Sequence, residues 1–173
     1  MNYAAKNDVG YLIDNGQFHP TEACAGKLSS LLLFIDKVAL HLTRWVRWDS
    51  DHVIALDDSL KEMCREIVAC DALDRVIIGS DYFDASINRV AAWVIGARNI
   101  QKALLYALLI PHASLAALQD EGRFTELLAM QEEIKTFPFT DVWAEYCRRM
   151  KVPAGPDWMK TIHAYTEEVL SKR

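Results

Sequence analysis

The sequence predicts an α/β fold, with a parallel sheet in the amino-terminal half and helices in the carboxyl-terminal half. Three short apolar runs, at residues 10–14, 37–41 and 75–81, have the length and composition of buried strands. The stretches between these runs have the apolar spacing of helices. An order of strand, helix, strand, helix is typical of right-handed βαβ units, whose strands lie parallel in one sheet.

Helical periodicity is found in seven segments: residues 21–35, 59–70, 90–110, 114–121, 125–136, 140–150 and 157–172. Ser114 and Thr125 are expected to be N-caps, and Asp157 is expected to cap the last helix. Turns are predicted at Gly122 and at residues 153–156, because glycine and proline end helices.

The segment 90–110 is apolar and long enough to span a membrane. Arg98 and Lys102 interrupt it, and two basic side chains near the middle of a span are costly in a bilayer. We therefore expect a buried helix that is broken near Gly96 and stops before Pro111, and no membrane partner.

The composition points to a single soluble domain. The chain has 173 residues, of which 51% are hydrophobic, so it can bury a sizeable core. A net charge of -5 disfavours an electrostatically bound nucleic acid, and no zinc-finger or phosphate-loop motif is present. The 4 cysteines form no CxxC pair and no signal segment opens the chain, which predicts a cytoplasmic location.

Each of the three predicted strands ends in a residue that can bind a metal: Asp14, His41 and Asp81. Taken singly, each has a more ordinary explanation, as a turn, a hydrogen-bonded core histidine and a helix cap. The carboxyl ends of parallel strands, however, meet at one edge of a sheet. Two carboxylates and an imidazole there would form a hard site suited to manganese, magnesium or cobalt.

A second acidic group lies in the long segment 43–56, which follows the middle strand. Asp49 and Asp51 are separated by one residue and could face the same cation, with His52 beside them. This spacing is explained at least as well by an acidic loop that is simply exposed to solvent. Long loops at strand ends are often functional, which keeps the second site open.

Several longer motifs resemble the L-rhamnose isomerase family. They are residues 14–22, 46–52 and 81–96, and the resemblance continues through residues 102–105 and 142–143 to the carboxyl end, so it covers essentially the whole chain. Members of this family interconvert L-rhamnose and L-rhamnulose with a divalent metal. The resemblance implies manganese, with cobalt, zinc or magnesium as alternatives, a sugar substrate and a homo-oligomer.

The resemblance also implies a fold, namely part of a (β/α) TIM barrel. A complete barrel needs roughly 250 residues. The chain therefore corresponds to the last three βα units, residues 1–111, followed by a helical extension, residues 112–173. By the same resemblance it lacks the first five units, and an unclosed sheet of this kind is expected to self-associate.

Roles follow from the resemblance, position by position. Asp14, His41 and Asp81 match ligands of a structural, substrate-holding metal. Asp49 and Asp51 match ligands of a second, catalytic metal, and Asp49 is the expected proton acceptor. Phe83 matches a residue on the apolar side of the sugar pocket.

The second site departs from the family pattern at Gln17. The family has a histidine there, and a neutral amide is a poorer metal ligand than imidazole. His19 could substitute, but it matches a different family histidine.

Three functions are therefore considered. The chain could be a working isomerase completed by further strands, a non-catalytic truncated fragment, or an oligomerisation module that uses the helical extension. For the isolated chain we expect no activity, because a glutamate ligand, the catalytic lysine and the pocket wall of the family have no counterpart.

Overall fold

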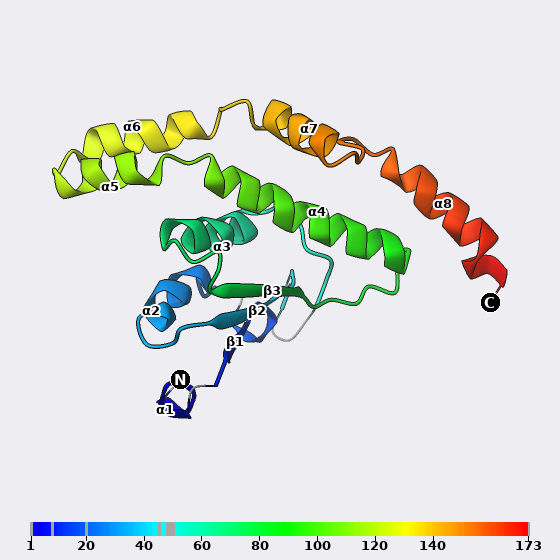
Figure 1. Cartoon of the computed structure of the whole chain (residues 1–173), viewed down its shortest axis with the longest axis horizontal. Coiled ribbons are helices and arrows are strands. Elements are labelled where there is room, and N and C mark those ends of the chain that lie inside the picture. Colours follow the sequence, from blue (N-terminus) through cyan, green and yellow to red (C-terminus); the bar gives the residue numbers. More distant parts are fainter. Residues whose placement is uncertain (1, 8, 20, 45, 48–50, 173) are drawn as a thin grey trace. The chain divides into compact units, whose positions relative to one another are not determined.

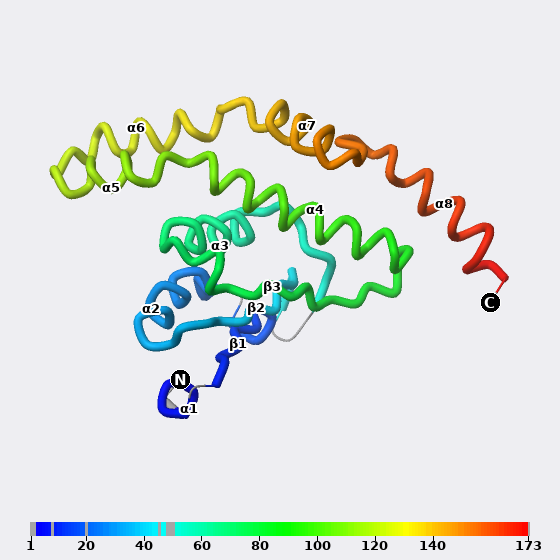
Figure 2. Tube along the Cα trace, viewed as in Figure 1, coloured from blue at the N-terminus to red at the C-terminus, as the bar shows by residue number. Residues whose placement is uncertain are grey.

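The computed structural model describes residues 2–7, 9–19, 21–44, 46–47 and 51–172 (Figure 1). The chain divides into two compact units, Met1–Leu108 and Leu109–Arg173. Figure 2 traces the same path as a tube. The first unit holds the sheet and the candidate site, and the second is helical.

The sheet is parallel, as the alternation of strands and helices predicts. Its strands are β1 (Tyr11–Asp14), β2 (Val38–Leu42) and β3 (Val76–Ser80), in the order β1-β2-β3. The register pairs Asp14 with His41 and His41 with Gly79. The ligand-type residues of β1 and β2, Asp14 and His41, are therefore direct neighbours across the sheet.

One face of the sheet carries the core. Val38, Leu40 and Leu42 of β2 are almost fully buried, and they pack with apolar residues of the helices that follow the strands. On the alternate positions, Leu12 is 46% exposed and Ile77 is 64% exposed. Because side chains alternate along a strand, Leu12 and Ile77 share their face with Asp14 and His41.

The helices of this unit are α1 (Asn2–Asn7), α2 (Leu28–Leu32), α3 (Asp58–Ala69) and α4 (Arg89–Leu108), with 3-10 turns η1 (Asn15–Gln17) and η2 (Ala25–Lys27). The helix predicted over residues 21–35 is much shorter than expected, because an irregular segment and η2 precede α2. The α1 helix is not apparent from sequence periodicity, although it contributes Ala4 to the core.

The sheet and α2 are joined by the guanidinium group of Arg75. It donates hydrogen bonds to the carbonyl oxygens of Leu32 (2.8 Å), Ile35 (3.1 Å) and Asp36 (2.9 Å). These carbonyls lie at and beyond the end of α2, where helical partners run out. The side chain thus fixes the start of β3 against the end of the preceding helix.

The predicted break of α4 near Gly96 is wrong, because the helix continues through it. Glycine is needed there for space: the Tyr82 side chain lies against Gly96, with its hydroxyl donating to the carbonyls of Ala92 (3.1 Å) and Trp93 (3.2 Å). Residues on the buried side of α4, such as Ala103 and Ala107, belong to the core.

No single helix in the described ranges is long and apolar enough to cross a membrane. The segments Arg89–Leu108 and His112–Asp120 pass such a test only as a bent pair, by length and composition.

The second unit contains α5 (His112–Asp120), α6 (Phe124–Ile134), α7 (Phe139–Arg149) and α8 (Trp158–Glu168), followed by η3 (Leu170–Lys172). Ser114 and Thr125 are not N-caps, because each lies inside its helix. Pro111 and Arg123 occupy the cap positions instead, and Asp157 stands at the start of α8 without a side-chain cap bond.

Candidate metal centre

Three side chains from the three strand ends come together at one edge of the sheet. His41 Nδ1 lies 3.6 Å from Asp14 Oδ2 and 3.2 Å from Asp81 Oδ2. One ligand atom from each residue lies within 4.8 Å of the other two. Asp14 and His41 are paired in register, and Asp81 directly follows β3. The spacing of ligand-type residues in the sequence thus becomes one cluster in space.

The backbone holds both carboxylates in this position. Asp14 Oδ1 accepts a hydrogen bond from the Gly16 amide (3.0 Å), while Oδ2 of the same carboxylate faces His41. The Asp81 amide donates to the Leu42 carbonyl (3.0 Å), which extends the β2–β3 ladder by one residue. Asp14 therefore forms a turn and faces the cluster at the same time, and these two interpretations are not alternatives.

The cluster is open to solvent. The side chains of Asp14, His41 and Asp81 are 24%, 40% and 50% exposed. The interpretation of His41 as a core histidine is therefore wrong. A helix-capping role for Asp81 is not observed either, because Asn88 Oδ1 accepts the Ala91 amide at the start of α4.

The donor set fits a divalent cation. Two carboxylate oxygens and one imidazole nitrogen are hard to borderline ligands, which suit manganese, magnesium, cobalt or zinc. In the structure an oxygen of each carboxylate lies close to the same ring nitrogen of His41. All three side chains are partly exposed to solvent, so a hydrated ion can reach them.

The second acidic group is only partly described. Asp49 lies outside the described residues, so its predicted metal-binding and catalytic roles stay predictions. The Asp51 carboxylate lies against Gly16: a Cβ built on Gly16 would lie 2.7 Å from Asp51 Oδ1 and 3.3 Å from Asp14 Oδ1. The structure therefore places Asp51 beside the turn that carries Asp14.

Gln17, at the position where the family has a histidine, and His19, its possible substitute, are both exposed side chains in the segment after β1. Gln17 is exposed at the end of η1. His19 Nδ1 lies 2.7 Å from Thr21 Oγ1, and the ring is exposed. His19 is no member of the group of possible ligands formed by Asp14, His41 and Asp81. The metal-binding role considered for Gln17 stays a prediction.

The segment after β3 carries the predicted sugar-pocket residue. Phe83 is 59% exposed, and the Arg89 guanidinium lies over its ring at 4.9 Å from the centroid. Beside it, hydrogen bonds from Ser86 lower the pKa of the Asp84 carboxyl. Burial raises the pKa of the neighbouring Tyr82. The ring of Phe83 is thus exposed, two residues after Asp81 in the chain.

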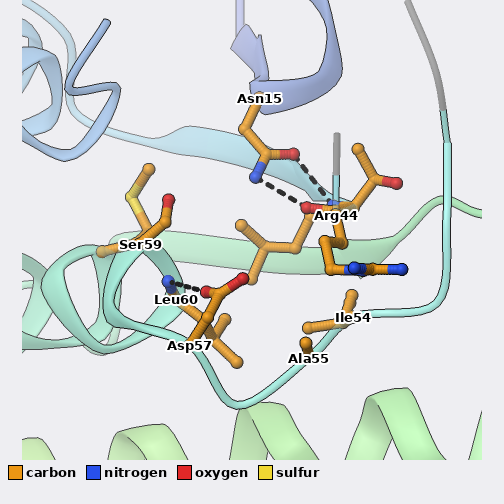
Figure 3. Close-up of a pocket in the computed structure, with 10 residues that line it drawn as sticks. Asn15, Arg44, Ile54, Ala55, Asp57, Ser59 and Leu60 are labelled. Carbon is orange, nitrogen blue, oxygen red and sulfur yellow. Dashed lines mark hydrogen bonds between the residues drawn. The ribbon is translucent and has the colours of Figure 1, made fainter. Parts of the chain in front are cut away.

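Sequence reasoning missed a buried polar pair behind the centre. Asn15 and Thr43 are the buried polar residues of the described chain, at 7% and 4% exposure. Asn15 Nδ2 donates to the Thr43 carbonyl (3.0 Å), and the Thr43 amide donates to Asn15 Oδ1 (2.8 Å) (Figure 3). The Asp-Asn-Gly triplet indicates a turn, but nothing local to the sequence indicates its partner 28 residues away.

The pair borders a small pocket between the sheet edge and the start of α3, where Asp57 and Leu60 also lie (Figure 3). Asp57 Oδ1 accepts the Leu60 amide (3.0 Å) and so caps α3. Arg44 and Asp57 are the titratable side chains among the residues that line it, and Asp57 is engaged as the cap of α3.

Comparison with known proteins agrees with the motifs. The sequence model of the family described as L-rhamnose isomerase (RhaA) matches residues 1–173. The chain is 50% identical over 173 residues to L-rhamnose isomerase of Escherichia coli (strain K12), and 49% identical to that of Enterobacter sp. (strain 638). In both cases 100% of this chain is covered, but it spans only 41% of the length of the relative. The chain belongs to the L-rhamnose isomerase family.

Proposed function

We propose that this chain carries part of the active centre of an aldose–ketose isomerase acting on L-rhamnose. In this proposal Asp14, His41 and Asp81 hold a divalent cation, with Mn²⁺ the first choice. The single observation that carries the proposal is the convergence of these three side chains at the carboxyl edge of a parallel sheet. Membership of the family supplies the reaction and the sugar.

A bound cation in such a centre supplies Lewis-acid chemistry, polarising the sugar carbonyl and hydroxyl groups. The residues of this chain would do the rest. Asp14 and Asp81 would supply the negative charge that retains such an ion, and His41 would supply a nitrogen ligand. Phe83, exposed two residues after Asp81, would cover the apolar side of the sugar.

The wider proposals concern the fold and the assembly. A three-stranded parallel sheet with helices packed on one face is compatible with part of a (β/α) barrel, and a barrel interior would lie on the face shared by Leu12, Ile77 and the cluster. Because the chain spans 41% of its relatives, we propose that turnover needs further strands, supplied by other polypeptide or by self-assembly.

The test is titration of the purified chain with Mn²⁺, followed by electron paramagnetic resonance of the free ion. We expect binding by the wild-type chain and a loss of affinity of at least about tenfold in His41→Ala, since even removal of a group behind a ligand costs 10- to 100-fold. His163→Ala is the matched control, because His163 is exposed on α8 and is no member of the cluster.

The same samples are then assayed for ketose formed from L-rhamnose. We expect no turnover above background from the chain alone, because its described residues supply three ligands for one cation. Equal Mn²⁺ affinity in wild type and His41→Ala would overturn the proposed site. Turnover by the isolated chain would show that three ligands suffice or that self-assembly completes the centre.

A further inference from the structure

The side chain of Asn15 makes two hydrogen bonds to the backbone of Thr43, in another segment of the chain. Its amide offers one donor and one acceptor to the Thr43 carbonyl and amide, at 3.0 Å and 2.8 Å, as a neighbouring strand would do. Asparagine suits this arrangement because its side chain carries both groups on one planar unit. The turn after β1 is thereby attached to the residue that follows β2.

Thr43 lies at the start of the segment 44–52, which is called the acidic loop because it contains Asp49 and Asp51. The Arg44 amide donates to the His52 carbonyl (3.0 Å) and the His52 amide donates to the Arg44 carbonyl (3.2 Å). Thr43 Oγ1 also donates to the His52 carbonyl (3.1 Å). These hydrogen bonds join the two ends of the loop, Thr43–Arg44 and His52, and Asn15 binds the first of them at Thr43. Asp51 directly precedes His52.

Gly16 provides the space that lets Asp51 approach. A Cβ at this position would lie 2.7 Å from Asp51 Oδ1, too close for both atoms to stay in place, and 3.0 Å from Thr43 Cγ2, which is a tight contact. The same methyl would press on Asp14 Oδ1, which accepts the Gly16 amide. Any larger residue here would therefore displace the Asp51 carboxylate from its place beside the turn.

We infer that Asn15 and Gly16 are positioning residues that hold the Asp51 carboxylate beside Asp14, so that the acidic loop adds its charge to the strand-end cluster. Asn15 fixes the base of the loop, and Gly16 leaves the room in which Asp51 lies. The inference rests on the proposed cation site and adds to it two residues that need not touch the ion. Both residues act through Asp51.

The first experiment compares the Mn²⁺ affinity of Gly16→Ala and Gly10→Ala, again by following the electron paramagnetic resonance signal of the free ion. The added methyl of Gly10→Ala meets nothing within 4 Å, so it controls for the substitution itself. We expect Gly16→Ala to bind Mn²⁺ roughly tenfold more weakly, the scale seen when a group behind a ligand is lost, and Gly10→Ala to match the wild type.

A double-mutant cycle separates positioning from general damage to the fold. In an Asp51→Asn chain the displaced group no longer has a charge, so Gly16→Ala should cost little further affinity. An equal loss in both backgrounds, or no loss in Gly16→Ala, would overturn the inference. The wild-type titration tests the cation site separately, since its failure would show in every chain.

The second experiment needs no metal. In Asn15→Ala the Thr43 amide loses its acceptor, so its hydrogen exchange, followed residue by residue by NMR, should become faster together with that of Arg44 and His52. Gly10→Ala should leave all three amides protected. If Asn15→Ala leaves their exchange unchanged, Asn15 does not hold the loop and the inference fails even where Mn²⁺ binds.

Discussion

Asp14 shows how one residue can satisfy two interpretations that compete in the sequence. Asp-Asn-Gly is a common turn, and a strand-end aspartate is also a common ligand. In the structure Oδ1 closes the turn and Oδ2 faces His41. The two roles are compatible because a carboxylate has two oxygens, whereas turn preferences describe only the local backbone.

The contact between Gly96 and Tyr82 can also be tested, because it attaches the residue after Asp81 to α4. A methyl at Gly96 would overlap the Tyr82 ring, whose Cζ lies 2.6 Å from the ideal Cβ position. We expect Gly96→Ala to lower the free energy of unfolding by roughly 1–3 kcal/mol through overpacking. The gain in helix propensity, about 0.5–1 kcal/mol, offsets part of this loss.

Urea unfolding measures this effect, and a second variant supplies the control. In a Tyr82→Ala chain the ring is absent, so adding Gly96→Ala should stabilise the helix instead of straining it. Gly96→Ala stabilising the wild-type chain would show that Tyr82 moves aside freely and does not fix the segment next to Asp81.

Among the elements, α3 and α7 are the helices whose ranges are best predicted from sequence, and α3 shows why. Its apolar residues recur on one face, and Leu60, Met63, Cys64 and Ile67 are buried. The segment that ends in α2 is less well predicted. Residues 21–35 have helical spacing, but only Leu28–Leu32 are α-helical, because periodicity indicates which face is buried and not where the helix starts.

The thiols of Cys24 and Cys64 lead to a prediction about pH. Burial raises their pKa to about 11 and about 12, from an ordinary value of 9.0. Between pH 9.0 and 11 the unfolded chain therefore releases protons that the folded chain keeps. Stability contributed by these neutral thiols is complete below the ordinary pKa and is lost as pH rises through the folded values, by up to about 1.4 kcal/mol per thiol per pH unit.

We expect the urea midpoint of the reduced chain to fall as pH rises from 8.5 to about 10.5, the interval in which the ordinary thiol ionises first. Tyrosine and lysine also titrate there, so Cys64→Ala is the comparison. It should start less stable, because of the cavity, and lose less stability with pH. Parallel pH curves for the two chains would contradict the assignment.

At the scale of the whole molecule, the exposed face of the sheet is the feature with the largest physical consequence. In the described residues β1 and β3 each pair on one side only, with β2, and Leu12 and Ile77 lie on the face away from the core. Parallel sheets ordinarily have both faces covered. Unpaired strand edges and exposed apolar side chains favour association.

We therefore expect the purified chain to self-associate, with a concentration-dependent mass in light scattering and sizing chromatography. Ile77→Lys places a charge on the open face and should shift the population toward monomer. Leu128→Lys is the matched control, because Leu128 is 59% exposed, like Ile77 at 64%, but lies on α6.

The outcome separates two ways of associating. Dispersal by Leu128→Lys and not by Ile77→Lys would place the contact on the helical unit, as the oligomerisation-module hypothesis requires. A stable wild-type monomer at every concentration would contradict the expectation for either surface.

The sequence by itself determined the order of strands and helices after α1 and the ligand-type residues at the strand ends, because alternation and apolar periodicity are local properties. Its motifs also identified the family. The tertiary structure alone decided the register that sets Asp14 level with His41, the approach of Asp51 to Gly16 and the pairing of Asn15 with Thr43. These depend on contacts between residues far apart in the chain, whose geometry is fixed only when the sheet and its loops pack together.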